Sequence, residues 1–274
     1  GNQIQAGRYT LSPGLTPEGL LEQLRAGAVD LVQVQFIEGW MAAQAVETVL
    51  QHPDVVDDLG VTMDYRADGV AFLTPDTNDA LIAVLGLDVE YIEGWFYPDT
   101  YRFAPGTKAT ELLRLAHEKM RVELDSAWQD RAVRDTLPDQ ESMLTLASIV
   151  EKETRRDDER GQIAGVFDRR LGRGMRLQTD PTVIYGVGLR YDGDIRRRDL
   201  TDDNPYNTYR IDGLPPAPIA LAGRASLAAV ARPADGTALF FVASGDPDGS
   251  HVFSDTVEDH ERAVKQYLKK IRGR

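Results

Sequence analysis

Apolar residues near the start of the chain follow first a helical and then a strand spacing. A helix is expected to begin at about Pro17, with Thr16 as its N-cap, and Gly27 is expected to end it. Apolar and polar residues then alternate from position 31 to 36, and this period of two predicts a strand. The chain is therefore expected to place a strand directly after its first helix.

A seven-residue pattern occurs twice. VQFIEGW at 34–40 returns as VEYIEGW at 89–95, and each copy predicts an alternating strand that runs into a Glu-Gly turn closed by Trp. Two copies are too few for a solenoid. We interpret them as a repeated strand-to-turn unit rather than as the mark of a repeat protein.

The rest of the chain mixes helices with one hairpin. Helices are predicted at 110–135, at about 141–156, at 163–171 and at 256–271, and a hairpin at 239–254. Thr256 and Asp259 have the spacing of a capping box for the last helix. Such a mixture, without regular strand-helix alternation, predicts an α+β fold. Because the composition turns to aromatic, Pro, Gly and Asn residues after Leu87, we place the main boundary there, between 1–87 and 88–274.

The charge of the chain argues against a nucleic-acid partner. Its 274 residues carry a formal net charge of -13, whereas phosphate binding depends on clustered Lys and Arg. The chain has no Cys and four scattered His, so no metal site is expected, and without a Gly-rich phosphate cradle no cofactor is expected. No apolar run is long enough to cross a bilayer, and a first residue other than Met suggests the excised soluble part of a longer protein.

The segment LASIVEKET, at 146–154, sets two carboxylates into an apolar helix. On such a helix Glu151 shares a face with Ala147 and Ser148, and Glu153 shares the opposite face with Ile149. A carboxyl group among apolar side chains tends to hold its proton, which is the state that a general acid needs. Both faces are apolar, so periodicity does not choose between the two glutamates. Either one can instead be a solvated or ion-paired helix residue.

Two further segments carry dense polar and aromatic groups. In LQTDPTVIYG, at 177–186, Gln178 and Asp180 belong to a polar cluster, and an Asp before Pro is expected in an extended or turned backbone. NPYNTYRIDGLPPAPIA, at 204–220, is expected to form a rigid loop that bears Tyr206, Asn207 and Tyr209. Aromatic rings and amides together suit a sugar, although rigid structural loops use the same residues.

These motifs resemble a known family in their order along the chain. EGWFYPDTYRF, LASIVEKET, ERGQIAGVFDRRL, LQTDPTVIYG, NPYNTY, GLPPAPIA and HVFSDTVEDH are similar to segments of the MltG/YceG-like family of endolytic murein transglycosylases, over about 92–267. Upstream, AGRYTLSPGLTPEGLLEQLRAG resembles the second half of that family's LysM-like module. The departures are Ala217 and Arg155, where the family commonly or often has Gly, and Glu261, where it commonly has Asn.

The resemblance selects one of the two glutamates. It places the family's catalytic glutamate at Glu151 and implies endolytic cleavage between N-acetylmuramic acid and N-acetylglucosamine in nascent peptidoglycan, leaving 1,6-anhydro ends. We expect Lys152 and Glu153 to tune or brace that helix. We expect a set of polar and aromatic residues to line the glycan groove, namely Gln178, Asp180, Tyr206, Asn207, Tyr209 and Glu153.

The resemblance also implies a setting for the enzyme. It implies an N-terminal membrane-spanning helix outside this sequence, a single-pass protein of the bacterial inner membrane, and a catalytic domain on the periplasmic side. Peptidoglycan strands are the expected substrate. Association with penicillin-binding proteins, and a role in ending glycan polymerisation, are expected as well.

Three other functions remain open from the sequence. A lysozyme-type hydrolase would use Glu151 as acid and Asp180 or Glu153 as second carboxylate. A non-catalytic glycan-binding module would bind without cutting. A lyase of aminodeoxychorismate, a label long attached to this family, would need pyridoxal phosphate, for which the sequence offers no phosphate cradle.

Overall fold

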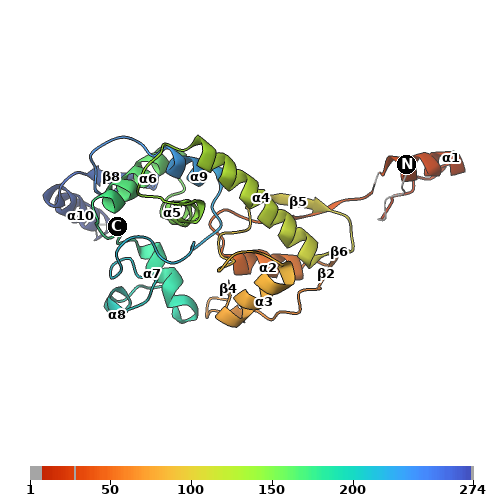
Figure 1. The fold of residues 1–274 in the computed structure, drawn as a ribbon, viewed down its shortest axis with the longest axis horizontal. Helices are drawn as coiled ribbons and strands as arrows, with labels where there is room; N and C mark the ends of the chain where they lie inside the picture. The colour runs from red at the N-terminus through yellow and green to blue at the C-terminus, as the bar shows by residue number, and fades with distance from the viewer. Residues whose placement is uncertain (1–7, 28, 273–274) are drawn as a thin grey trace.

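The computed structural model describes residues 8–27 and 29–272, and within them short sheets are embedded in a mainly helical chain (Figure 1). The helices are α1 (Pro17–Ala26), α2 (Ala42–Leu50), α3 (Pro75–Leu85), α4 (Ala109–Asp130), α5 (Gln140–Glu153), α6 (Asp157–Gly172), α7 (Asp180–Val187), α8 (Arg197–Thr201), α9 (Arg224–Ala231) and α10 (Val257–Arg272), with a 3-10 turn at Gly188–Arg190. This mixture confirms the α+β fold class.

Within the described residues the strands pair only two by two. They are β1 (Val32–Gln35), β2 (Val55–Val56), β3 (Asp64–Tyr65), β4 (Ala71–Phe72), β5 (Thr100–Phe103), β6 (Thr107–Lys108), β7 (Phe240–Ala243) and β8 (His251–Ser254). The pairs β1·β5, β3·β4 and β7·β8 are antiparallel and β2·β6 is parallel. In the longest-range pair, Val32 faces Phe103 and Gln35 faces Thr100.

Two apolar cores lie along one long helix. The first core packs around β1, α2, α3, β5 and the first half of α4, and the second packs around α5, α6, α9 and the second half of α4. Figure 1 shows α4 running from one group of elements to the other. Every residue of α5 from Met143 to Glu151 is buried, because α4, α6 and α9 all pack against it. The helix that carries the two glutamates is therefore a rigid central element.

Helix ends are where the sequence prediction and the structure differ most. Helix α4 ends at Asp130 rather than at 135, and α5 ends at Glu153 rather than at 156. Helix α6 begins at Asp157, six positions before the predicted start at 163. Its first turn consists of three acidic residues, which stabilise a helix N-terminus through the helix dipole. Apolar periodicity cannot detect such a polar turn.

Both copies of the seven-residue pattern form the same turn, but only the first copy is preceded by a strand. In both copies the Trp N–H donates to the Ile carbonyl three residues before it, at 3.1 Å, and the Gly has a positive φ, 77° at Gly39 and 82° at Gly94. In the first copy the turn follows strand β1, as predicted. The strand predicted for the second copy is wrong, because β1 takes its partner β5 from residues beyond that turn.

The predicted division at Leu87 remains a prediction, but the apolar cores do not follow it. Strand β1 precedes position 87 and its partner β5 follows it, and the first core contains Leu81 together with Leu113. The LysM-like module is not confirmed. In the described part of that segment, α1 begins after the Thr16 N-cap and ends at Gly27 as predicted, buries none of its residues, and lies at the end of an arm (Figure 1). No helix in the described ranges is long and apolar enough to span a membrane.

Candidate functional site

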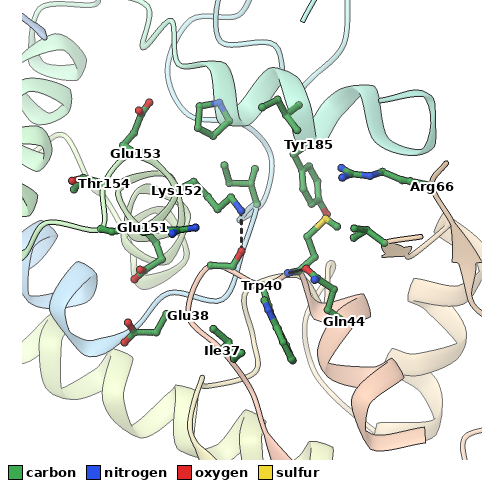
Figure 2. A pocket seen from close by; sticks show the side chains of 17 residues that line it. Ile37, Glu38, Trp40, Gln44, Arg66, Glu151, Lys152, Glu153, Thr154 and Tyr185 are labelled. Carbon is green, nitrogen blue, oxygen red and sulfur yellow. Dashed lines mark hydrogen bonds between the residues drawn. The ribbon is translucent and has the colours of Figure 1, made fainter. Parts of the chain in front are cut away.

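The C-terminal end of α5 opens into a pocket of about 610 Å³. The first Glu-Gly turn closes one side of this pocket, α7 closes another, and Arg66 reaches it from the β3–β4 hairpin (Figure 2). Of the predicted site residues, Glu151 and Glu153 line it. We refer to it as the central pocket.

Glu151 is held on both carboxylate oxygens. The backbone N–H of Gly223, the N-cap of α9, donates to Oε2 at 3.0 Å, and Nη2 of Arg160 donates to Oε1 at 3.3 Å. The side chains of Glu151 and Arg160 are 5% and 7% exposed, so this ion pair is largely shielded from water. The sequence predicted apolar surroundings for Glu151. The neighbouring residues of α5 are indeed buried and mostly apolar, but the carboxylate itself contacts a cation and an N–H donor from other elements.

Glu38 is a second carboxylate at the same place. It belongs to the first Glu-Gly turn, is exposed, and lines the central pocket. Burial and the charge of Glu151 raise the pKa of Glu38, whereas Arg160 lowers it. Sequence reasoning missed Glu38, although the repeated turn motif marked the position.

Glu153 faces away from Glu151, as helical spacing predicted. In Figure 2 the two side chains extend to opposite sides of α5. The hydroxyl of Thr179 donates to Oε1 of Glu153, which is half-buried. Burial raises the pKa of Glu153 to about 7, and the nearby charge of Asp180 acts in the same direction. Glu153 therefore links α5 to the segment before α7.

Lys152 connects the helix to the first turn. Its Nζ donates to the carbonyl oxygen of Gly39 at 3.0 Å, the contact drawn as a dashed line in Figure 2. Burial lowers the pKa of Lys152, and the nearby cations Arg66 and Arg155 act in the same direction. This hydrogen bond fixes the turn that carries Glu38 against the end of α5.

A second cavity, of about 460 Å³, contains Tyr206. We call it the aromatic cavity, because Phe72, Tyr91 and Tyr185 also line it. The rings of Tyr185 and Tyr206 lie 4.8 Å apart between centroids. Tyr185 lines the central pocket as well, so the two cavities share a wall.

A third cavity, of about 390 Å³, contains Gln178, Asp180 and Tyr209. We call it the polar cavity. The hydroxyl of Tyr209 donates to Oδ1 of Asp180 at 2.7 Å, and Glu153 lines both this cavity and the central pocket. The expectation that Asp180 lies outside a helix is wrong, because it is the first residue of α7. Its side chain is nevertheless exposed, since the first helical turn leaves it at the end of the helix.

Asn207 does not line any of these three cavities. The residue is 1% exposed, and its Nδ2 donates to the carbonyl oxygens of Asp199 and Asp202 at 3.1 and 2.8 Å. Its Oδ1 accepts from the N–H of Tyr209 at 3.1 Å. Asn207 therefore shapes the loop that presents the two tyrosines. Among the described residues no cluster of His, Asp and Glu is suited to hold a metal ion.

Comparison with known proteins gives consistent matches over nearly the whole chain. Residues 1–266 match the YceG-like family. The endolytic murein transglycosylase of Bacillus subtilis (strain 168) is 31% identical over 273 residues, which cover 97% of this chain and 73% of the relative. The protein of the same name from Streptococcus pneumoniae serotype 2 is 28% identical, and the chain spans 51% of its length.

A solved structure matches as well. The crystal structure of a yceG-like protein from Listeria monocytogenes superposes with a TM-score of 0.65 and 29% sequence identity. The superposition covers 94% of this chain and 84% of that one. The likeness therefore extends over both apolar cores.

Proposed function

The chain belongs to the YceG-like family, and from this premise we propose that it cuts peptidoglycan strands internally and leaves 1,6-anhydro-N-acetylmuramic acid ends. Its class, a transglycosylase of the lyase type that acts on peptidoglycan, follows from the curated relatives. The observation that carries the proposal is the position of Glu151, which lines the central pocket from the end of a rigid, buried helix.

One carboxyl group can carry out both proton transfers of this reaction. Glu151 in its protonated form donates to the glycosidic oxygen as the bond from C1 of the muramic residue breaks and positive charge develops on the ring. The resulting carboxylate then accepts the proton of the C6 hydroxyl as that oxygen bonds to C1. The proton returns to Glu151, and water does not take part.

The arrangement of the cavities suits a polymer. The aromatic cavity, the central pocket and the polar cavity form a series, because Tyr185 separates the first two and Glu153 the last two. Sugar rings stack on tyrosine rings, and hydroxyl groups need paired donors and acceptors. We propose that a glycan strand passes along this series with its scissile bond beside Glu151, and that Gln178, Asp180, Tyr206 and Tyr209 contact it.

The test is digestion of purified glycan strands by the wild type and by Glu151→Gln, with products identified by mass. The wild type should produce anhydro ends, and the variant should lose cleavage by roughly 100-fold or more, because an amide cannot transfer the proton. Arg160 also donates to Ser226 at 3.2 Å, a contact that does not involve Glu151, so a thermal melt of the variant should still show a cooperative transition. Full activity of the variant would refute the role of Glu151.

A lysozyme-type hydrolase remains the second candidate because of Glu38. The carboxylates that the sequence suggested as partners do not suit that role: Glu153 points away from Glu151, and Asp180 lies in the polar cavity. Glu38 lines the central pocket together with Glu151 and lies beside the same residue, Gly223, so it would supply the second carboxylate of a hydrolase. Reducing ends in the wild-type digest would identify a hydrolase.

The cellular setting completes the proposal. We propose that the chain works on the periplasmic side of the inner membrane, attached through a segment outside this sequence, and that it ends glycan polymerisation beside penicillin-binding proteins. The support is the resemblance of its motifs to the family. Co-purification of the full-length protein with a peptidoglycan synthase is the measurement that tests the association.

A further inference from the structure

The carboxylate of Glu38 is an open group in an otherwise well-bonded site. No other described residue donates a hydrogen bond to it, whereas each oxygen of Glu151 accepts one. Glu38 is also exposed on the wall of the central pocket. Figure 2 shows the carboxylates of Glu38 and Glu151 on the same side of that pocket. An ionisable group in this position is free to face a bound substrate.

Gly223 fixes the relation between the two carboxylates. Its N–H donates to Glu151, and its α-carbon faces Glu38 so closely that an added Cβ would lie 1.8 Å from Oε1 of Glu38. The φ of Gly223 is -83°, which any residue adopts, so backbone conformation does not require glycine here. The absence of a side chain instead makes room for Glu38 beside Glu151.

The surroundings of Glu38 hold both signs of charge. Arg160 is the cation that acts on it, and Glu151 and Asp157 are the anions. Arg160 is already bonded to Glu151, Asp157 and Ser226. The negative charge of Glu38 is therefore only partly balanced by the protein, and a cationic centre in the pocket would balance it further.

We propose that Glu38 is a second carboxylate of the active site, placed to stabilise the positive charge that develops at C1 of the muramic residue. The inference rests on the proposed function. Glu151 carries out both proton transfers, the bond from C1 to the leaving oxygen breaks, and the bond from the C6 oxygen to C1 forms. Glu38 stays ionised, forms no bond and takes up no proton. Its contribution is electrostatic and arises only in the transition state.

The first test compares Glu38→Gln with Glu111→Gln, an exposed glutamate of α4 that lines none of the three cavities. The rate of formation of anhydro ends and the KM for purified glycan are measured for each. Glu38→Gln should lower kcat by roughly 100-fold and change KM by less than about 3-fold, since charge stabilisation is confined to the transition state. Glu111→Gln should match the wild type in both quantities.

The second test keeps the charge and moves it. Gly223→Ala retains the N–H that donates to Glu151 but forces Glu38 away from its neighbour. This variant should also lose kcat, by roughly 10-fold or more. A kcat for Glu38→Gln within about 2-fold of the wild type, or a change in KM alone, would overturn the inference. Failure of the proposed function is separate, since it shows in the wild-type digest as the absence of anhydro ends.

Discussion

Glu38 and Glu93 share the same local sequence but lie in opposite environments. Glu38 lines the central pocket, whereas Glu93 is 5% exposed and accepts N–H groups from Ala42, at the start of α2, and from Gly94. The hydroxyl of Tyr185 also donates to Glu93, at 3.3 Å. The glutamate of the first copy thus lines the central pocket. The glutamate of the second copy fixes α2 and Tyr185, which lines the aromatic cavity, through hydrogen bonds.

The burial of Glu93 predicts a dependence of stability on pH. Burial raises its pKa from 4.5 to about 7, although its hydrogen bonds and Lys152 act in the opposite direction. Between these values the folded state binds more protons than the unfolded state, so the free energy of unfolding falls as pH rises through this window. In Glu93→Gln the decrease in the free energy of unfolding between pH 4.5 and 7 should be smaller than in the wild type by roughly 3 kcal/mol.

Urea unfolding of the wild type and Glu93→Gln at pH 4.5 and 7.5 measures this effect. Some dependence should remain in the variant, because burial raises the pKa of Glu153 to about 7 as well. Glu111→Gln serves as the control and should keep the wild-type dependence. Identical curves for the wild type and Glu93→Gln would contradict the assignment.

The sequence identified the two glutamates of α5 but not the residues from other elements that lie next to them. Helical spacing correctly placed Glu151 and Glu153 on opposite faces, because that relation depends on nearby positions only. It did not identify Glu38, Arg160 or Gly223, which α5 meets through tertiary contacts. The role of Asn207 was unpredictable for the same reason: an amide in a loop bonds equally well to a glycan or to the protein's own carbonyl groups.

At the scale of elements, the two Glu-Gly turns give a matched pair of substitutions. Both glycines have a positive φ, so alanine strains both turns by about 1 kcal/mol. At Gly39 the new Cβ would meet only Cδ of Lys152 at 3.8 Å and Cγ of Glu151 at 4.0 Å, which are ordinary contacts, whereas at Gly94 it would lie 2.5 Å from Cβ of Pro218. Gly94→Ala should therefore destabilise the protein by about 1 to 3 kcal/mol more than Gly39→Ala. Urea unfolding at a single pH measures the difference, and equal losses would contradict it.

The elements that the sequence predicted well have local signals. The N-cap of α1 and the β7–β8 hairpin are confirmed, and so is half of the capping box of α10, in which the N–H of Asp259 donates to the hydroxyl of Thr256. Each of these features depends on residues a few positions apart. The start of α6 and the missing second strand were predicted wrongly. The start of α6 depends on acidic residues rather than on apolar spacing. The strand predicted at 89–95 is absent because β1 pairs with β5 instead.

For the whole molecule, the cores predict which fragments fold. A fragment of residues 31–274 lacks α1, which buries none of its residues, and should keep a cooperative melt within a few degrees of the full chain. A fragment of residues 88–274 lacks β1, α2 and α3, and so exposes the apolar face that β5 and α4 bury against them. It should show no cooperative transition. Thermal melts followed by circular dichroism distinguish the two, and a stable 88–274 fragment would instead support an independent domain.

The site also has a consequence for the order of events during synthesis. The site is formed by residues 38, 151, 160 and 223, which are far apart in the sequence. During synthesis, residue 38 can therefore contact residue 223 only after residues 39–223 have been added. Contacts between such distant segments form late, because closing long loops is entropically costly. A nascent or prematurely ended chain that stops before α9 therefore lacks the assembled site. Cutting of glycan strands is therefore expected only from a chain whose synthesis has passed α9.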